Sequence, residues 1–387
     1  MVYLDNNATT PLLPEVAEEM KKCFNMYGNP SSLHSFGREI KEKIEYARFQ
    51  VARFINCNKN NIVFTSGGSE GNNCIINSFF SKYKNNGKLL VSKIEHPSIL
   101  NYAKYLLSIG YDIDFIDVDS KGKVLLDRLE DKLKTEKRVM ISVMIANNET
   151  GIIQDIENIS SIARKYGAFI HSDMVQGLGK MVIDLEKIDV DYATFSSHKI
   201  NGPKGIGAIY IKDIKDFMPF IHGGHQEKGL RAGTENTLGI IGFGKACEIR
   251  EKELFSYIQK MSKLREKLLD GIINNINDIL INTDMENSVP NTLNISFKGV
   301  EGEAIMLYLD IEGIAVSTGS ACSSGELEPS HVLLAMGLDP EIAHGSIRFS
   351  LGIQNTEEDL FYVVDRLKNV ISKLRKISSV YSKGAGV

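Results

Sequence analysis

This 387-residue chain lacks the features that mark several large classes of protein. Its five cysteines include no C-x-x-C pair, which argues against a disulfide framework and a cysteine-rich zinc site. No apolar run reaches the length of a membrane-spanning helix, and the chain turns polar directly after its start, so we expect no membrane span and no signal peptide. A net charge of −4 gives no electrostatic case for binding nucleic acid or anionic membranes.

The sparse, odd number of cysteines favours a reducing compartment, and we expect a cytoplasmic protein. The rest of the composition is that of an ordinary globular protein, long enough for more than one domain. From residue 61 to residue 211, strand-like and helix-like runs alternate, which predicts a mostly parallel sheet with helices on both faces. The predicted strands cover residues 62–65, 89–92, 113–118, 139–145, 169–172, 192–195 and 206–211. The last strand follows its predecessor too closely for a helical crossover, so we expect these two to be antiparallel.

A long helical pattern over residues 238–275 leads out of this region. Shorter patterns follow, which predict strands at 292–297, 314–317 and 346–351 and helices at 302–309 and from Thr356 onward. We therefore expect an α/β protein with two domains. A large domain, residues 14–255, holds a mostly parallel seven-stranded sheet between helices, and a smaller α+β domain covers residues 256–387. The polar N-terminal segment, residues 1–13, is expected to join the smaller domain, and it is either a loose terminus or part of a site.

One strand end stands out for its chemistry. The apolar run that begins at Tyr192 ends in Ser196-Ser197-His198-Lys199, directly before a Gly/Pro turn. In an open α/β sheet, ligands bind at the carboxyl ends of the strands. A lysine there can lose its proton when it is desolvated, and a neutral amine can form a Schiff base with a carbonyl. A plain surface lysine is the alternative, and it is the commoner case for an isolated lysine.

Two other strand ends favour the functional interpretation. The strand at 169–172 leads into Asp173, and the strand at 62–65 leads into Gly67-Gly68-Ser69 at a predicted helix start. The backbone N–H groups of such a helix start bind anions. A pyridoxal 5′-phosphate (PLP) site needs a lysine for the aldehyde and an acid that keeps the ring nitrogen protonated. The three strand ends together therefore predict a PLP site.

Further candidates follow neighbouring strands. His96 comes just after the strand at 89–92 and can stack on a flat ring, or it can be a helix-start residue bonded to the backbone. Asn148 follows the strand at 139–145, and Gln176 lies three residues after Asp173. Either amide can reach the phenolic oxygen of the cofactor, although the first of them also fits a plain turn.

Cys322 differs from the other cysteines because it lies in a Ser/Gly loop, residues 317–325, whereas the others lie in helix-like patterns or at a helix end. A thiolate in such a loop can meet a substrate and then a partner, and we interpret the other four as structural. Arg348, in a predicted strand, either holds a carboxylate or forms a structural ion pair.

The glycine-rich stretch 222–234 offers two weaker candidates. His222 and His225 have no further ligands nearby, so no metal is expected there. Arg231 and Thr234 either clamp an anion or belong to an ordinary loop.

Taken in this order, these segments resemble the cysteine desulfurases (NifS/IscS-like), in the class V branch of the fold-type I PLP enzymes. The resemblance covers nearly the whole chain. It rests on residues 3–11, 64–70, 95–96, 147–149, 173 with 176, 196–199, 231–234, 319–322 and 346–352.

The resemblance implies a PLP-dependent enzyme that converts L-cysteine to L-alanine and leaves a persulfide on Cys322. Lys199 would carry the cofactor, His96 would stack on its ring, and Asp173 would pair with the pyridinium nitrogen. Asn148 and Gln176 would contact the phenolic oxygen. The phosphate would be held by Gly68, Ser69, Ser196 and His198, joined by Thr234 from the other subunit of a homodimer. The substrate carboxylate would be held by Arg348 with Asn29 nearby.

Ser69 stands where this family commonly has threonine, and because the hydroxyl is kept we expect phosphate binding to survive. The stretch after Cys322 resembles the long-loop group of the family. The sulfur acceptor is expected to be a protein such as an iron–sulfur scaffold, or a relay for tRNA thiolation. No resident metal is expected, and Cys322 is a candidate transient ligand of an iron–sulfur cluster. Selenocysteine lyase, a class V aminotransferase and a non-catalytic scaffold protein are the alternatives.

Overall fold

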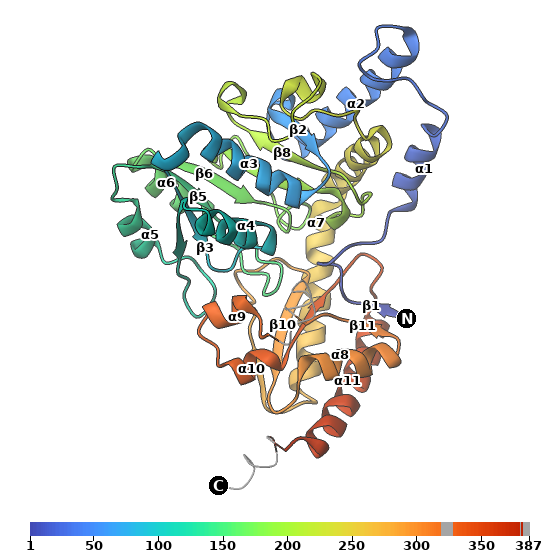
Figure 1. Ribbon diagram of the computed structural model, residues 1–387. Coiled ribbons are helices and arrows are strands. Elements are labelled where there is room, and N and C mark those ends of the chain that lie inside the picture. The colour runs from blue at the N-terminus through green and yellow to red at the C-terminus, as the bar shows by residue number, and fades with distance from the viewer. Residues whose placement is uncertain (319–327, 380, 382–387) are drawn as a thin grey trace.

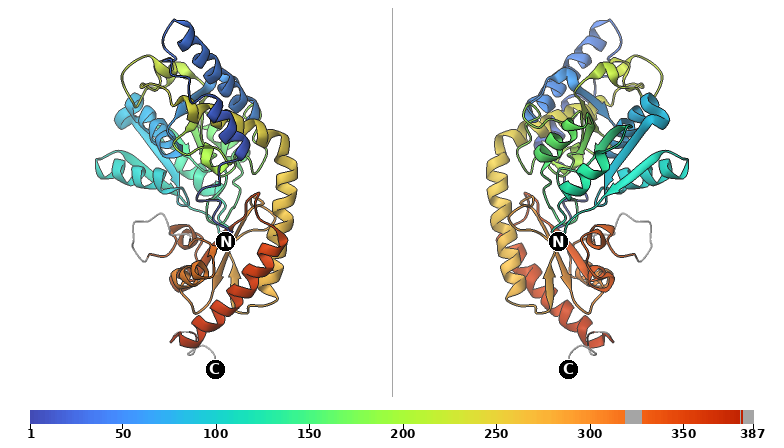
Figure 2. Two further views of the ribbon diagram at one scale, coloured as in Figure 1. Left: turned by 90° about the vertical axis from the view of Figure 1, so that its right-hand side faces the viewer. Right: turned by 90° about the vertical axis from the view of Figure 1, so that its left-hand side faces the viewer.

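The computed structural model describes residues 1–318, 328–379 and 381. Figure 1 shows an upper part built around a large sheet and a lower part built around a small one. Helix α7 (Thr237–Ile273) runs from the upper part into the lower part, and the side views of Figure 2 show it along one flank. The N-terminal strand β1 (Val2–Tyr3) lies in the lower part, where it pairs in parallel with β11 (Ile314–Ala315).

The large sheet has seven strands, and all seven strands predicted from the sequence are present. Their order across the sheet is β2 (Ile62–Thr65), β8 (Gly207–Ile211), β7 (Tyr192–Ser196), β6 (Phe169–Asp173), β5 (Arg138–Ser142), β3 (Gly87–Ser92) and β4 (Asp112–Ile116). In this sheet as described, β8 alone runs against the other strands, which confirms the expected antiparallel pairing with β7. The other six strands therefore end at one common edge.

The strands of this sheet are buried on both faces because apolar side chains point to either side in turn. In β3, Leu90 belongs to one core cluster, whereas Leu89 and Val91 belong to the cluster on the opposite face. The helices that accompany the large sheet are α1 (Pro14–Lys22), α2 (Ser35–Phe54), α3 (Gly68–Tyr83), α4 (Pro97–Ser108), α5 (Leu126–Leu133) and α6 (Ile156–Lys165). The apolar side chains of Ile40, Ile44, Ala47 and Val51 in α2 are buried in the core, and α2 packs against α7.

Helix α3 approaches the large sheet closely at its first turn. A Cβ atom on Gly71 would lie 2.8 Å from the side chains of both Ile209 and Thr194. Glycine at this position therefore lets the N-terminus of α3 lie directly against β7 and β8.

The lower part contains an antiparallel sheet in the order β12 (Ser346–Ser350), β10 (Thr292–Phe297) and β9 (Ile279–Ile281). Four helices accompany it: α8 (Gly302–Ile311), α9 (His331–Ala335), α10 (Pro340–His344) and α11 (Glu357–Ile377). Thr356 is the N-cap of α11, as the sequence predicted, and it also forms a capping box with Asp359. The sequence did not predict β1, β9, α9 or α10, because elements of two to five residues are too short to display a period.

The division into domains of residues 14–255 and 256–387 stays a prediction. Within the described residues, no helix combines the length and the apolar composition needed to cross a membrane.

Candidate active site

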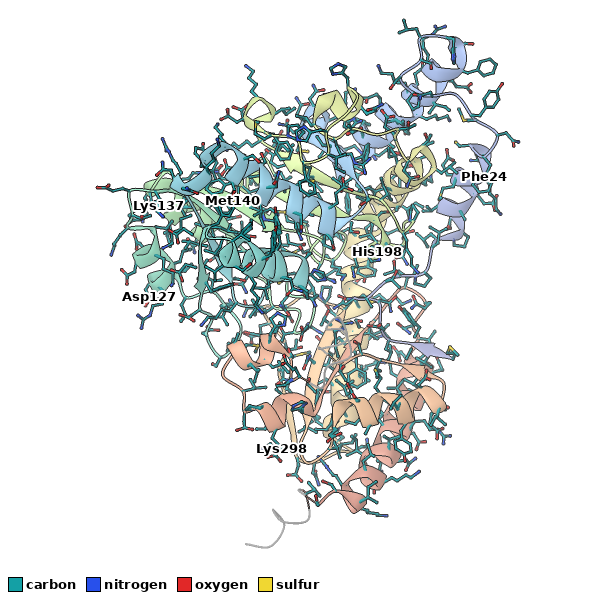
Figure 3. All side chains as sticks on the ribbon, viewed as in Figure 1. Phe24, Asp127, Lys137, Met140, His198 and Lys298 are labelled. Atoms are coloured by element: carbon teal, nitrogen blue, oxygen red, sulfur yellow. The ribbon has the colours of Figure 1, made fainter. Side chains whose placement is uncertain are left out.

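The predicted site residues gather at the carboxyl edge of the seven-stranded sheet. Asp173 is the last residue of β6, and it pairs in register with Thr194 of β7. A 3-10 turn (Ser197–Lys199) follows β7 directly, and it places Lys199 at the same edge of the sheet. Figure 3 labels His198, which lies at the lower border of the upper part, facing the small sheet. The lysine and the acid are therefore brought together, as the sequence predicted.

Lys199 is half-buried and is held by the N-terminal segment. Its Nζ donates hydrogen bonds to the backbone oxygens of Asn7 (2.5 Å) and Ala8 (2.7 Å). The Thr10 hydroxyl donates to the backbone oxygen of His198 at 2.9 Å. Residues 7–10 are thus part of the site wall, which decides the open question about this segment in favour of a site.

A cavity of about 490 Å³ lies next to this lysine at the start of α3. The four residues predicted to hold phosphate are all part of its lining, which consists of Thr9, Ser66, Gly67, Gly68, Ser69, Glu70, Ser196, His198, Lys204 and Gly205. The first N–H groups of α3 have no intrahelical acceptor, and the helix dipole favours negative charge there. Helix N–H groups, hydroxyls and a lysine form the donor set that a phosphate requires, so these residues fit the phosphate of PLP.

His198 is neutral in this setting. Burial, together with the cations Lys199, Lys204 and Lys180, lowers the pKa of His198 to about 4. Its Nδ1 lies 3.1 Å from the hydroxyl oxygen of Thr9. The imidazole therefore acts as a hydrogen-bonding group at neutral pH and adds no charge.

Arg231 is already occupied by a carboxylate of the chain. Its Nε donates to Glu70 at 2.9 Å, and the backbone N–H of Ser66 donates to the same carboxylate at 2.9 Å. Although burial acts to raise it, these hydrogen bonds lower the pKa of Glu70. Thr234 is exposed and lines a neighbouring cavity of about 210 Å³, and its expected role in a second subunit stays a prediction.

A chain of hydrogen bonds connects Asp173 to His96. Asn72, a buried residue of α3, donates from Nδ2 to Asp173 Oδ2 (2.8 Å) and to Ser98 Oγ (2.9 Å). Because Ser98 Oγ accepts this bond, its own hydroxyl hydrogen can be donated to His96 Nδ1, which lies 2.8 Å away. Asp173 also accepts from the N–H of Val175 at 3.0 Å, which fixes its second oxygen. Asn72 and Ser98 thus bridge two groups that sequence reasoning treated separately.

His96 combines both interpretations that the sequence allowed. It is the N-cap of α4, with Nδ1 accepting from the N–H of Ser98, and it also borders a cavity of about 670 Å³ beside Ser69. Burial lowers the pKa of His96, while Asp173 acts to raise it and Lys199 to lower it. Since Nδ1 accepts a hydrogen bond, we infer that the proton of the neutral ring is on Nε2. Ring stacking itself stays a prediction.

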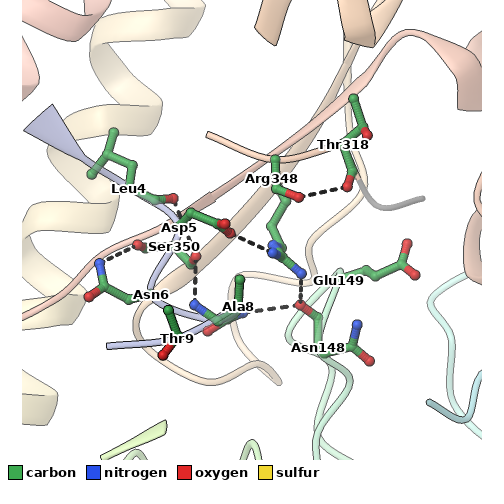
Figure 4. Close-up of polar contacts among 12 residues, drawn as sticks. Leu4, Asp5, Asn6, Ala8, Thr9, Asn148, Glu149, Thr318, Arg348 and Ser350 are labelled. Atoms are coloured by element: carbon green, nitrogen blue, oxygen red, sulfur yellow. Dashed lines mark hydrogen bonds and ion pairs between the residues drawn. The ribbon is translucent and has the colours of Figure 1, made fainter. Parts of the chain in front are cut away.

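Arg348 joins the small sheet to the site (Figure 4). Its Nη2 donates to Asp5 Oδ1 at 2.6 Å, and its Nη1 donates to the backbone oxygen of Asn148 at 3.0 Å. The structural ion pair, one of the two readings left open, is therefore present. Arg348 is 5% exposed, and its Nε has no partner within the described residues. The Nε–H of the guanidinium is thus left for another acceptor, and the carboxylate role stays a prediction.

The two predicted amides differ in their bonding. In the described part of the chain, no hydrogen bond reaches the side chain of Asn148, so its amide is available to a ligand. Gln176 is buried and donates from Nε2 to the backbone oxygen of Asn7 at 3.0 Å. Asn29 lies exposed in the loop between α1 and α2, and among the described residues no hydrogen bond links it to Arg348. Its substrate role stays a prediction.

Cys322 lies outside the described residues, but the chain that follows is anchored to the site. Ser330 Oγ donates to the buried carboxylate of Glu149 at 2.5 Å. His331 Nε2 donates to the backbone oxygen of Glu95 at 3.0 Å. Ser330 and His331, which follow Cys322 in the sequence by eight and nine residues, are thus held against Glu149 and Glu95.

The other four cysteines have unreactive surroundings. Burial raises the pKa of Cys57 and of Cys74 to about 12, and it also raises the pKa of Cys247 and of Cys23. Few thiolates form at neutral pH under these conditions, in line with a structural role. No group of three or more side chains suited to a metal ion occurs among the described residues, where His222 and His225 are exposed.

Sequence reasoning missed Asn72, Ser98 and Lys180. Asn72 and Lys180 each lie four residues after a predicted cofactor residue, Gly68 and Gln176 respectively, and both positions are helix-like or turn-like in pattern. An i, i+4 spacing after a known ligand is the signal that points to them.

Comparisons with known proteins show the family of the chain. A family model described as aminotransferase class-V matches residues 2–363. A curated protein, cysteine desulfurase IscS from Dictyoglomus turgidum, is 46% identical over 379 residues, which cover 97% of this chain and 96% of that protein. A second, cysteine desulfurase IscS from Clostridium botulinum, is 43% identical over 384 residues, with coverage of 98% and 96%.

Solved structures give the same picture. A structure described as a NifS-like protein aligns with a TM-score of 0.90 and 41% identity, covering 96% of this chain and 100% of the other. A structure described as SspA in complex with cysteine aligns with a TM-score of 0.81 and 32% identity, covering 91% and 99%. The similarity therefore extends over both sheets.

Proposed function

The chain belongs to the class V aminotransferase family and, within it, to the cysteine desulfurases, and on that premise we propose the roles of its residues. The reaction converts L-cysteine to L-alanine and passes the sulfur on, and the fold is that of the NifS-like enzymes, as expected. The observation that supports our assignment best is the convergence of Lys199, Asp173 and the cavity at the start of α3 at one sheet edge.

PLP is the cofactor that this set of residues suits. When bound, it supplies an aldehyde that bonds an amine and a ring that draws electron density from the substrate's α-carbon. Lys199 would hold the aldehyde, the Asp173 carboxylate would pair with the ring nitrogen, and His96 would pack on the ring. Ser69, Ser196, His198 and the N–H of Gly68 would bind the phosphate, while Asn148 and Gln176 would donate to the phenolic oxygen.

Two charged groups handle the substrate. Arg348 binds the carboxylate of cysteine, with Asn29 beside it. Lys199, once its amine is free, removes the α-proton at Nζ and later returns a proton to the product. The short hydrogen bonds from Nζ to Asn7 and Ala8 indicate how the free amine is held near the sheet edge.

Cys322 accepts the sulfur. Its thiolate attacks the substrate's sulfur atom, so a sulfur–sulfur bond forms while the carbon–sulfur bond of the substrate breaks. The electron pair of the broken bond stays with the carbon, which takes up a proton and becomes the methyl group of alanine. The sulfur atom remains on Cys322 as a persulfide, ready for an acceptor protein.

We further propose a cytoplasmic homodimer in which Thr234 completes the phosphate site of the second subunit. The IscS relatives suggest an iron–sulfur scaffold as the acceptor, with a relay for tRNA thiolation as the other candidate. The two-domain division at residue 255 belongs to the same proposal.

The test compares two variants of the purified holoenzyme. Cys322→Ala should keep the colour of bound PLP but form alanine from cysteine at least a hundredfold more slowly, since no thiolate attacks the sulfur. Lys199→Ala should no longer be labelled through PLP by borohydride. Alanine formation by Cys322→Ala at the parent rate would remove Cys322 from the mechanism, and keto-acid formation by the parent would indicate an aminotransferase.

A further inference from the structure

Lys180 is a buried lysine that the proposed mechanism does not use. It is 2% exposed, although lysine is among the residues least often buried. Its Nζ donates to Asn7 Oδ1 at 2.9 Å and, over a short contact, to Gln176 Oε1. Both acceptors are neutral amide oxygens, and in the described part of the chain no carboxylate forms an ion pair with this amine.

The position of this amine costs free energy. Burial and the neighbouring cations Lys199, Arg348 and Arg250 hold the pKa of Lys180 well below its ordinary value. A methionine or leucine would fill the same space without a desolvation penalty. The amine therefore calls for a reason other than packing.

The two hydrogen bonds define the orientation of one side-chain amide in the site. A lysine amine has N–H groups to donate, so the atom of Gln176 that faces Lys180 is the oxygen. The nitrogen of that amide then points the other way, and it donates one N–H to the backbone oxygen of Asn7 at 3.0 Å. That same oxygen accepts from Lys199 at 2.5 Å. Gln176 Nε2 and Lys199 Nζ thus share one acceptor, and the second N–H of Gln176 is left for a group beside this lysine.

The Asn7 side chain is held by the same amine together with Asn291, whose Nδ2 also donates to Asn7 Oδ1 at 3.1 Å. With its oxygen facing Lys180, its Nδ2 donates to the backbone oxygen of Asn148 (3.1 Å) and to the hydroxyl of Thr292 (2.8 Å). Asn148 is the other residue assigned to the phenolic oxygen. One amine therefore orders both segments that carry those amides.

We propose that Lys180 is a positioning residue for the cofactor ring: by donating to the amide oxygens of Asn7 and Gln176, it directs the N–H of Gln176 toward the phenolic oxygen of PLP. This inference rests on the proposed function, because it needs PLP on Lys199. It adds a role that neither the strand-end pattern nor the ligand set contains.

The experiment follows the absorbance of bound PLP against pH in the holoenzyme. An N–H donated to the phenolic oxygen stabilises its anion, so loss of that donor moves the spectral transition to higher pH. Lys180→Met should raise the transition by about one pH unit, as expected for losing one hydrogen bond to a charged group. The side chain in Lys180→Gln is one bond shorter and cannot reach both oxygens, so this variant should also raise the pH of the transition. It replaces Lys180→Met in the test if the methionine variant does not fold.

A double-variant comparison separates positioning from simple charge. In a Gln176→Ala background, Lys180→Met should cause no further shift, because the group it positions is gone. Arg250→Met is the matched control: it removes another buried cation near Lys180 whose hydrogen bonds go to Gly179 and Asn201, not to Gln176. The spectral transition of Arg250→Met should stay within a few tenths of a pH unit of that of the parent.

Three results would overturn the inference: an unshifted transition in whichever Lys180 variant folds, an equal shift in the Gln176→Ala background, or an equal shift in Arg250→Met. A parent protein without PLP on Lys199 would instead overturn the proposed function. The two failures are therefore distinguishable.

Discussion

Single side-chain amides decide how the groups of this site act together. Asn72 donates two hydrogen bonds from one nitrogen, to Asp173 and to Ser98, and through Ser98 it reaches His96. The acid that faces the ring nitrogen and the histidine beside the ring are thereby held in a common geometry. A shift of either one would move the other.

Removing this amide should therefore slow the reaction. Asn72→Ala takes one donor from a buried carboxylate, and a hydrogen bond to a charged group contributes about 1.5–3 kcal/mol, so kcat for alanine formation should fall at least tenfold. The measurement is steady-state alanine formation with PLP saturating. Asn73→Ala is the control, because Asn73 donates to the backbone oxygen of Ser98 and not to Asp173. An equal loss in the control would contradict the bridging role.

At the scale of elements, helix α9 anchors the segment that follows Cys322. Its N-cap Ser330 accepts from the N–H of Leu333 at 3.2 Å and donates to the buried carboxylate of Glu149. Burial raises the pKa of Glu149, which indicates that this carboxylate depends on its few partners. The short helix thus ties the lower part of the chain to the loop after β5.

Ser330→Ala should cost more than an ordinary helix cap. We expect a loss of about 2 kcal/mol in the free energy of unfolding, because both the cap and the partner of a buried carboxylate are removed. Thr356→Ala is the matched control, since Thr356 caps the exposed start of α11, and its loss should be about 1 kcal/mol. Urea unfolding of the two PLP-free variants measures both. Equal losses would show that the bond to Glu149 adds nothing.

The direction of each strand in the large sheet decides whether its end carries a predicted site residue. β2, β6 and β7 each lead directly into a predicted site residue, because the parallel strands finish at one edge. The one antiparallel member of the sheet as described, β8, delivers none, since its carboxyl end points the other way. Direction within the sheet, more than residue type, therefore separates site residues from ordinary ones.

For the molecule as a whole, buried histidines couple stability to pH. Burial lowers the pKa of His171 to about 3, where its ring lies between the hydroxyls of Ser142 and Thr194. Between pH 6.5 and about 3, the unfolded chain binds a proton at this position and the folded chain does not. The stability from this group is thus complete above pH 6.5 and is lost as pH falls through that window. Burial raises the pKa of Glu95 to about 8, which acts in the opposite direction.

The contribution of His171 is therefore measured as a difference. His171→Gln keeps a hydrogen-bonding side chain but cannot be protonated, so its Tm should fall less than that of the parent between pH 7 and pH 4. Between pH 7 and pH 4, the parent should lose roughly 3 kcal/mol more of its free energy of unfolding than the variant. The exposed His225 provides the control variant, His225→Gln, which should follow the parent curve. Parallel curves for all three proteins would refute the assignment.

The sequence by itself determined the layout of the large sheet and the edge where chemistry takes place. Apolar runs and the turns that end them are local signals, so the seven strands, the antiparallel β8 and the strand-end positions of Asp173 and Lys199 could be predicted. The family pattern extended this to Cys322, which lies outside the described residues. The shortest elements, β1 and β9, carry too few residues for such a signal.

Only the tertiary structure decided which side chains cooperate. Asn7 meets Lys199 and Lys180 across more than 170 residues, and Asn72 reaches Asp173 across 101. Such contacts depend on the order of strands and on the direction of each side chain, and a linear pattern contains neither. Of the two roles considered for Arg348, the structure shows the ion pair, which it forms with Asp5. The sequence could not show this pair, because it joins residues from the two ends of the chain.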